Sequence, residues 1–147
     1  MLLSSATETE ALGRQIAGMM GIGDVIALSG PLGAGKTTLA RGLLSGLGFA
    51  GEVASPSFAL VIPYAPPSVR LAVAHVDLYR IESPDQMEEL GLDDFLTEGA
   101  LVIEWPERMG TSLWPESLHL NLATPDDGSR ILTADVPPSW IRRWLWT

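Results

Sequence analysis

Apolar residues along the chain form two kinds of pattern, short continuous runs and stretches with helical periodicity. The runs Val25–Leu28, Leu71–Val76 and Leu101–Ile103 are short enough for strands buried on both faces of a sheet. Apolar positions three or four residues apart predict amphipathic helices over Thr7–Met20 and about Lys36–Leu47. Strands that alternate with helices in this order predict an α/β domain with a mostly parallel sheet flanked by helices.

The last part of the chain follows a different pattern. Leu118, Leu120 and Leu122 alternate with polar or small residues, and Ile131 begins another strand-like run. The turn-forming segment Pro125–Gly128 lies between them. This arrangement predicts a C-terminal hairpin at the edge of the sheet.

Two of the expected helices carry capping signals at their starts. Thr7 and Glu10 fit a capping box for the first helix, and Ser83 with Gln86 fits one for a later helix. A further strand is expected around Phe58–Ile62, between two loops.

A glycine-rich turn connects the first buried strand to the second helix. Its segment Gly30–Thr37, GPLGAGKT, fits the phosphate-loop pattern G-x-x-x-x-G-K-[ST] in full. Glycines let successive backbone N–H groups converge on phosphate oxygens, and the following helix directs its positive end at the same anion. Lys36, the only lysine of the chain, is expected to reach the outer phosphates, and the Thr37 hydroxyl to ligate Mg²⁺. The expected nucleotide-binding residues of this P-loop NTPase-like fold are Gly30, Leu32, Gly33, Ala34, Gly35, Lys36, Thr37 and Thr38.

Two acidic residues directly follow runs that are expected to be buried strands. A phosphate-loop site commonly has its magnesium-binding or catalytic carboxylate at such a position. Asp77 follows one run and Glu104 the next, so both carboxylates are expected at the carboxyl edge of the sheet. The alternative is that either acid begins a solvated loop, and the pattern alone does not assign their roles. His75 lies inside an apolar run, which favours a core histidine with a hydrogen-bond partner. His75 and His119 lack metal-ligand spacing, so a zinc site is not expected.

Composition and charge narrow the functional classes. The 147 residues have the length of one domain, and we predict a single domain over 1–147. The chain has no cysteine, which excludes disulfides, thiolate metal sites and a cysteine nucleophile. Its net charge of -9 disfavours direct binding of nucleic acid. No apolar run is long enough to span a membrane and the N-terminus lacks a signal-peptide pattern, so a cytoplasmic location is expected.

Four segments together resemble one family. They are GPLGAGKTT from Gly30, SPSF from Ser55, HVDLYR from His75 and EWP from Glu104. Their order and spacing resemble the bacterial TsaE proteins, formerly YjeE, over about residues 7–106. The first segment alone occurs in many NTPases, whereas its combination with the last two is specific to this family.

The resemblance implies a P-loop ATPase that binds ATP and Mg²⁺. The resemblance also implies that the protein works with TsaB-like and TsaD-like transferase subunits, which make threonylcarbamoyladenosine beside the tRNA anticodon. The protein would then contact tRNA only indirectly, through the complex. The resemblance gives Glu104 the magnesium role and makes Asp77, with Lys36, a catalytic residue. The segment around Ser57 resembles a switch loop in which serine replaces the family threonine.

Other functions remain open at this point. A small-molecule kinase would use the same phosphate loop with Asp77 or Glu104 as base, although no arginine-rich lid is evident. A nucleotide-dependent switch with slow hydrolysis is close to the family role, and a GTPase is disfavoured because the chain has no N-K-x-D segment. Candidate adenine contacts are Thr9 and Arg130.

The C-terminal tryptophans allow two interpretations. Trp140, Trp144 and Trp146 form either a partner-binding patch or, more commonly for such residues, part of the core.

Overall fold

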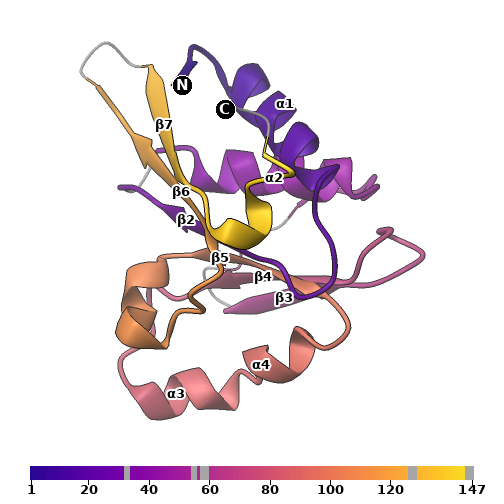
Figure 1. Cartoon of the computed structure of the whole chain (residues 1–147), viewed down its shortest axis with the longest axis vertical. Coiled ribbons are helices and arrows are strands. Elements are labelled where there is room, and N and C mark those ends of the chain that lie inside the picture. The colour runs from indigo at the N-terminus through magenta and orange to yellow at the C-terminus, as the bar shows by residue number, and fades with distance from the viewer. Residues whose placement is uncertain (32–33, 54–55, 57–59, 126–128, 145–147) are drawn as a thin grey trace.

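The computed structural model describes residues 1–31, 34–53, 56, 60–125 and 129–144. Its centre is a seven-stranded sheet with the order β1-β7-β6-β2-β5-β4-β3 (Figure 1). The strands are β1 (Leu2–Leu3), β2 (Val25–Ser29), β3 (Val61–Tyr64), β4 (Val73–Asp77), β5 (Ala100–Glu104), β6 (Leu118–Ala123) and β7 (Arg130–Asp135). The helices are α1 (Ala6–Ala17), α2 (Lys36–Gly46), α3 (Pro84–Glu89) and α4 (Leu92–Phe95), with 3₁₀ segments η1 (Pro106–Ser112) and η2 (Pro138–Trp140).

The middle of the sheet is parallel and its two sides are antiparallel. Strands β6, β2, β5 and β4 pair in parallel, whereas β3 pairs antiparallel with β4 and β7 with β6. In the register of the central strands, Glu104 lies opposite both Leu28 and Asp77. The carboxyl ends of β2, β4 and β5 are therefore level with one another, which brings the residues after them to one edge.

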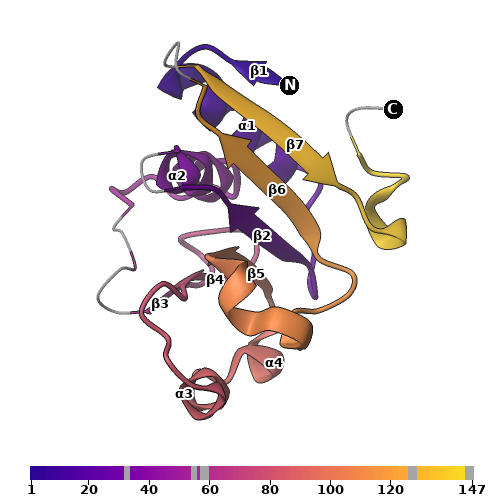
Figure 2. The same ribbon diagram turned by 90° about the vertical axis from the view of Figure 1, so that its left-hand side faces the viewer.

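Each face of the sheet is covered by its own apolar core. On one face α1 and α2 pack over residues such as Ile26 and Val102. On the other face α3, α4 and η1 pack over neighbouring residues of the same strands, such as Val25 and Ile103. Figure 2 shows α1 and α2 at one end of the molecule and α3 and α4 at the other. The continuous apolar runs are explained by this two-sided burial.

Helices α1 and α2 approach each other closely at glycines. A Cβ at Gly13 would lie 2.6 Å from the carbonyl oxygen of Leu39, and a Cβ at Gly42 would collide with the backbone of Glu10. A Cβ at Gly46 would lie 2.6 Å from the Cβ of Ala17. The two backbones can therefore pack at this distance only because these positions have no side chain.

Most predicted elements are confirmed, including the α/β fold with helices flanking a sheet whose centre is parallel, the buried strands and the C-terminal hairpin. The hairpin turn and the start of the expected Phe58–Ile62 strand fall partly on residues outside the described ones. The two-residue β1 adds a strand outside β7. In the part of the chain that the structure describes, no helix combines the length and apolar character needed to cross a membrane.

Two helix caps were tested by the structure. The prediction for the first helix is wrong, because Ser5, and not Thr7, caps α1 by accepting from the Glu8 backbone N–H at 3.2 Å. The prediction for α3 is confirmed, since Ser83 accepts from the Gln86 N–H and the Gln86 side chain accepts from the Glu82 N–H.

The C-terminal tryptophans divide between core and partial exposure. Trp140 is fully buried, which confirms the core interpretation for this residue. Trp144 is half-buried and packs edge-on against it, with ring centroids 6.4 Å apart. Trp146 lies outside the described residues.

Candidate functional site

The loop between β2 and α2 uses glycine at positions with a positive backbone φ. Gly30 has a φ of +145°, and a Cβ there would lie 2.5 Å from the carbonyl oxygen of Leu122. Gly35 has a φ of +102° and directly precedes α2, so the first turn of this helix has no side-chain cap. Backbone N–H groups at an uncapped helix start favour an anion. Of the remaining sequence-predicted loop residues, Ala34 is buried, whereas Leu32 and Gly33 lie outside the described residues.

Lys36, the first residue of α2, is held inside the site. Its Nζ donates to the Gly30 carbonyl oxygen at 2.5 Å and lies 3.5 Å from the ring centroid of Trp105. The side chain is only 5% exposed, and this burial lowers its pKa. Nearby Glu104 opposes the shift most strongly, so the ammonium group lies in an acidic pocket.

Glu104, the last residue of β5, joins the loop to the sheet. Its Oε1 accepts from the Thr37 hydroxyl at 3.4 Å, and its Oε2 lies 2.7 Å from Nε2 of His75 (β4). His75 is fully buried, which confirms the expected core histidine with a partner. Its Nδ1 has no hydrogen-bond partner among the described residues.

The oxygens of Thr37 and Glu104 fit a magnesium ion bound together with a nucleotide. Mg²⁺ prefers oxygen ligands and commonly takes one or two carboxylates, with the remaining positions filled by phosphate and water. Within the described residues, no three His, Cys, Asp or Glu side chains converge on one point. Thr37 and Glu104 could hold such an ion together with phosphate and water oxygens.

Asp77, the last residue of β4, is 6% exposed and lies opposite Glu104 in the sheet register. Its Oδ1 accepts from the backbone N–H of Tyr79 at 2.9 Å. The carboxylate therefore holds the start of the loop after β4, beside the phosphate loop. The two strand-end acids thus share an edge but have different partners.

Thr9 and Arg130, the candidate adenine contacts, line one small pocket of about 120 Å³. Gly35 and Thr38 of the phosphate loop and α2 line it as well. Thr9 is buried, and its hydroxyl donates to the Ser5 carbonyl at 3.2 Å. The structure thus brings together residues from α1, α2 and β7 that are far apart in the sequence.

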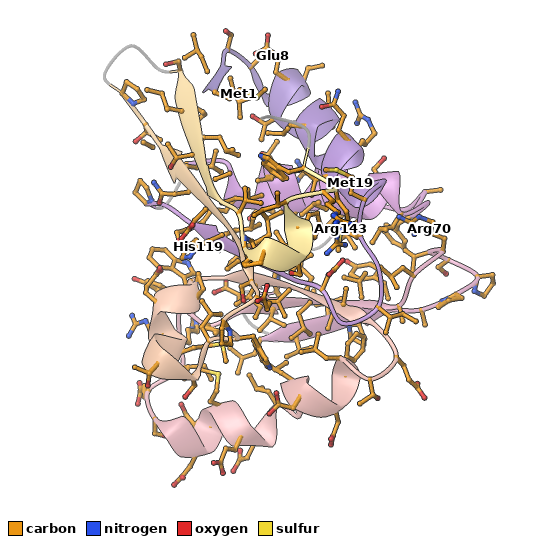
Figure 3. All side chains as sticks on the ribbon, in the orientation of Figure 1. Met1, Glu8, Met19, Arg70, His119 and Arg143 are labelled. Carbon is orange, nitrogen blue, oxygen red and sulfur yellow. The ribbon has the colours of Figure 1, made fainter. Side chains whose placement is uncertain are left out.

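The sequence analysis gave no specific role to several other side chains of this region. The Trp105 ring packs 4.9 Å from that of Tyr79, and the E-W-P segment is the signal that could have identified it. The Ser29 hydroxyl lies 2.6 Å from His119 Nε2 and 3.4 Å from a carboxylate oxygen of Glu107. Figure 3 shows His119 on the opposite side of the molecule from Arg70.

Comparisons with known proteins agree with one another. A family model described as "Threonylcarbamoyl adenosine biosynthesis protein TsaE" matches residues 3–132. The chain is 42% identical to the tRNA threonylcarbamoyladenosine biosynthesis protein TsaE of Streptomyces coelicolor over 112 residues, 76% of each chain. It is 36% identical to the protein of that name from Bacillus subtilis, over 86% of this chain and 78% of that one. The crystal structure of Bacillus subtilis YdiB superimposes with a TM-score of 0.79 at 27% identity, covering 97% of this chain and 88% of that one.

Proposed function

The chain belongs to the TsaE family of threonylcarbamoyl adenosine biosynthesis proteins, and from this membership we propose that it is a P-loop ATPase. It binds ATP with Mg²⁺, hydrolyses ATP slowly, and supports TsaD-like and TsaB-like transferase subunits. These subunits form threonylcarbamoyladenosine next to the anticodon of tRNA. A cytoplasmic location stays a prediction.

The observation that carries the proposal is the contact between Thr37 and Glu104, with oxygens 3.4 Å apart. A hydroxyl at the start of α2 and a carboxylate at the end of β5 come from sequence positions far apart, and they meet directly beside the buried Lys36. A chance match to the loop pattern would not require a strand-end carboxylate at this place. The arrangement is the one that phosphate-loop enzymes use.

Each residue has a separate task in this proposal. The loop backbone and the start of α2 bind the phosphates, and Lys36 leaves the Gly30 carbonyl to contact the outer phosphate oxygens. Thr37 and Glu104 would hold Mg²⁺, which neutralises phosphate charge when bound. Asp77 orients the attacking water or the loop that senses the terminal phosphate. Thr9 and Arg130 form the wall nearest the base.

Slow hydrolysis in the isolated chain is supported by the positions of several of its arginines. Fast phosphoryl transfer commonly needs an arginine close to the transferred group. Four of the eight arginines are engaged away from the phosphate loop: Arg14 and Arg41 with Glu10, Arg70 with the Ala17 carbonyl, and Arg143 with Asp24. Arg130 lies beside Gly35, and we assign it to the base and not to the transferred phosphate. The net charge of -9 also disfavours tRNA, so the partner subunits supply its contacts.

The test compares the purified chain alone with the chain plus its TsaD-like and TsaB-like subunits. We expect slow ATP turnover and weak tRNA binding for the chain alone, and ATP- and Mg²⁺-dependent assembly with the subunits. Fast turnover alone, or strong tRNA binding at physiological salt, would contradict the proposal. Transfer of phosphate from ATP to a free metabolite would replace it with the small-molecule kinase.

A further inference from the structure

A second concave surface lies away from the phosphate loop. A groove of about 610 Å³ runs between α3, α4 and η1. Figures 1 and 2 both show α3 and α4 at the end of the molecule opposite α1. None of the residues assigned above to nucleotide or metal lines this groove.

The groove combines an apolar floor with an acidic rim. Ile81, Leu92 and Met109 form buried parts of its lining, and Met87 and Trp114 are half-buried. The rim carries four carboxylates, namely Glu82, Glu88, Asp93 and Asp94, all on exposed residues. Arg108 is the one basic residue among its described lining residues.

We propose that this groove is a docking site for a segment of a partner protein that has an apolar side chain flanked by lysine or arginine. An apolar side chain would be anchored in a partly preformed pocket, and its basic neighbours would meet the carboxylates. The inference rests on the proposed function, because the partner is one of the transferase subunits that the chain supports.

The charge of the groove favours a basic protein segment over a nucleic acid or a second copy of this chain. A nucleic acid would bring phosphates against the four carboxylates. A second copy of this chain has a net charge of -9 and a single lysine, so it offers a poor match to an acidic rim. A basic, partly apolar protein segment satisfies both the floor and the rim.

A row of stacked side chains connects the groove to the phosphate loop. The Arg108 guanidinium, in the groove lining, lies 5.7 Å from the ring centroid of Tyr79. Tyr79 packs on Trp105, and the ammonium group of Lys36 lies over Trp105. A partner seated in the groove therefore contacts the first member of a row whose last member binds phosphate. We expect docking and nucleotide binding to be coupled through this row.

The experiment uses two charge-reversal pairs of the full chain. Glu82→Lys with Glu88→Lys changes two exposed rim residues. The control, Glu89→Lys with Glu98→Lys, makes the same change in net charge at exposed positions outside the groove. Affinity for the purified TsaD-like and TsaB-like subunits is measured by calorimetry with ATP and Mg²⁺, at low and high salt. ATP binding by each variant alone and sedimentation of the chain alone are measured in parallel.

We expect the groove pair to weaken subunit binding about tenfold or more and the control pair much less, with the difference shrinking at high salt. ATP affinity without subunits stays unchanged in both pairs. If the wild-type chain binds the subunits and the two pairs weaken this binding equally or not at all, the docking site in the groove is wrong and the proposed function stands. A wild-type chain that does not bind the subunits would overturn the proposed partners and the docking site with them. If the chain alone associates with itself and the groove pair abolishes this association, the groove binds a second copy of the chain and not a transferase subunit.

Discussion

The phosphate-loop site and the groove between α3, α4 and η1 hold charge in opposite ways. In the site Lys36, Asp77 and Glu104 are each at most 6% exposed. In the groove the carboxylates remain in water above an apolar floor. A buried charge is costly unless it is paired, so the site specifies one arrangement of its side chains. Exposed charges are screened and adaptable, which suits the recognition of a partner.

The largest expected effect is the loss of nucleotide binding in Lys36→Ala. The variant removes a charge-assisted contact to phosphate, which should cost roughly 1.5–3 kcal/mol or more of binding free energy. The fold should remain, because the helix and the loop glycines are unchanged. Calorimetric titration with ATP and Mg²⁺ measures the effect. Arg41→Ala removes an exposed cation from the same helix and serves as the matched control. Unchanged affinity in folded Lys36→Ala would remove the basis for the phosphate-loop assignment.

The next effect separates the two buried acids. Glu104→Gln should weaken the magnesium dependence of ATP binding, because Glu104 lies beside Thr37. Asp77→Asn should keep ATP and magnesium affinity and slow hydrolysis, because its interaction matters mainly in the transition state. Measurements of magnesium-dependent ATP affinity and of single-turnover hydrolysis for both variants show which acid holds the metal. The assignment is reversed if Asp77→Asn loses the magnesium dependence and Glu104→Gln keeps it.

The smallest effect is a pH dependence of nucleotide affinity that the groove variants should not alter. Burial lowers the pKa of Lys36, so as pH rises the free protein loses this proton earlier than an ordinary lysine with a pKa of 10.5 would. Binding of phosphate favours the charged form. ATP affinity should therefore fall as pH rises through the lowered pKa, and the fall should begin below 10.5. Calorimetry over alkaline pH measures it, and a flat profile up to that value would contradict it.

The sequence predicted best what depends on neighbouring residues. The strand, glycine turn and helix around the phosphate loop are encoded within one continuous segment, and the carboxylates at the ends of β4 and β5 follow from the strands before them. The cap of α1 was misplaced because serines and threonines crowd the start of that helix and several fit a cap. The short segments α4, η1 and β1 have too few residues to show a period.

The partners of the site side chains could not be predicted in the same way. Glu104 is 67 residues from Thr37 and 29 from His75. The register of β4 and β5 brings His75 near Glu104, and the packing of α2 on the sheet brings Thr37 there. The stacking of Lys36 on Trp105 depends on how the chain turns after β5. The groove likewise joins two separate stretches of sequence, and their one motif, the capping box at Ser83, predicts a helix start and not a binding surface.

The glycine contacts between α1 and α2 also bear on the size of the pocket lined by Thr9 and Arg130, where we propose that the base of the nucleotide binds. Thr9 lies on α1 and Thr38 on α2, so these two helices form facing walls of the pocket. Gly13 and Gly42 fix how closely the helices lie, although neither lines the pocket. In that proposal, the space available to the base is set by two glycines that do not line the pocket. We therefore expect a methyl group added at Gly13 to push α1 and α2 apart and to change the nucleotide preference of the proposed site, while every residue that lines the pocket stays the same.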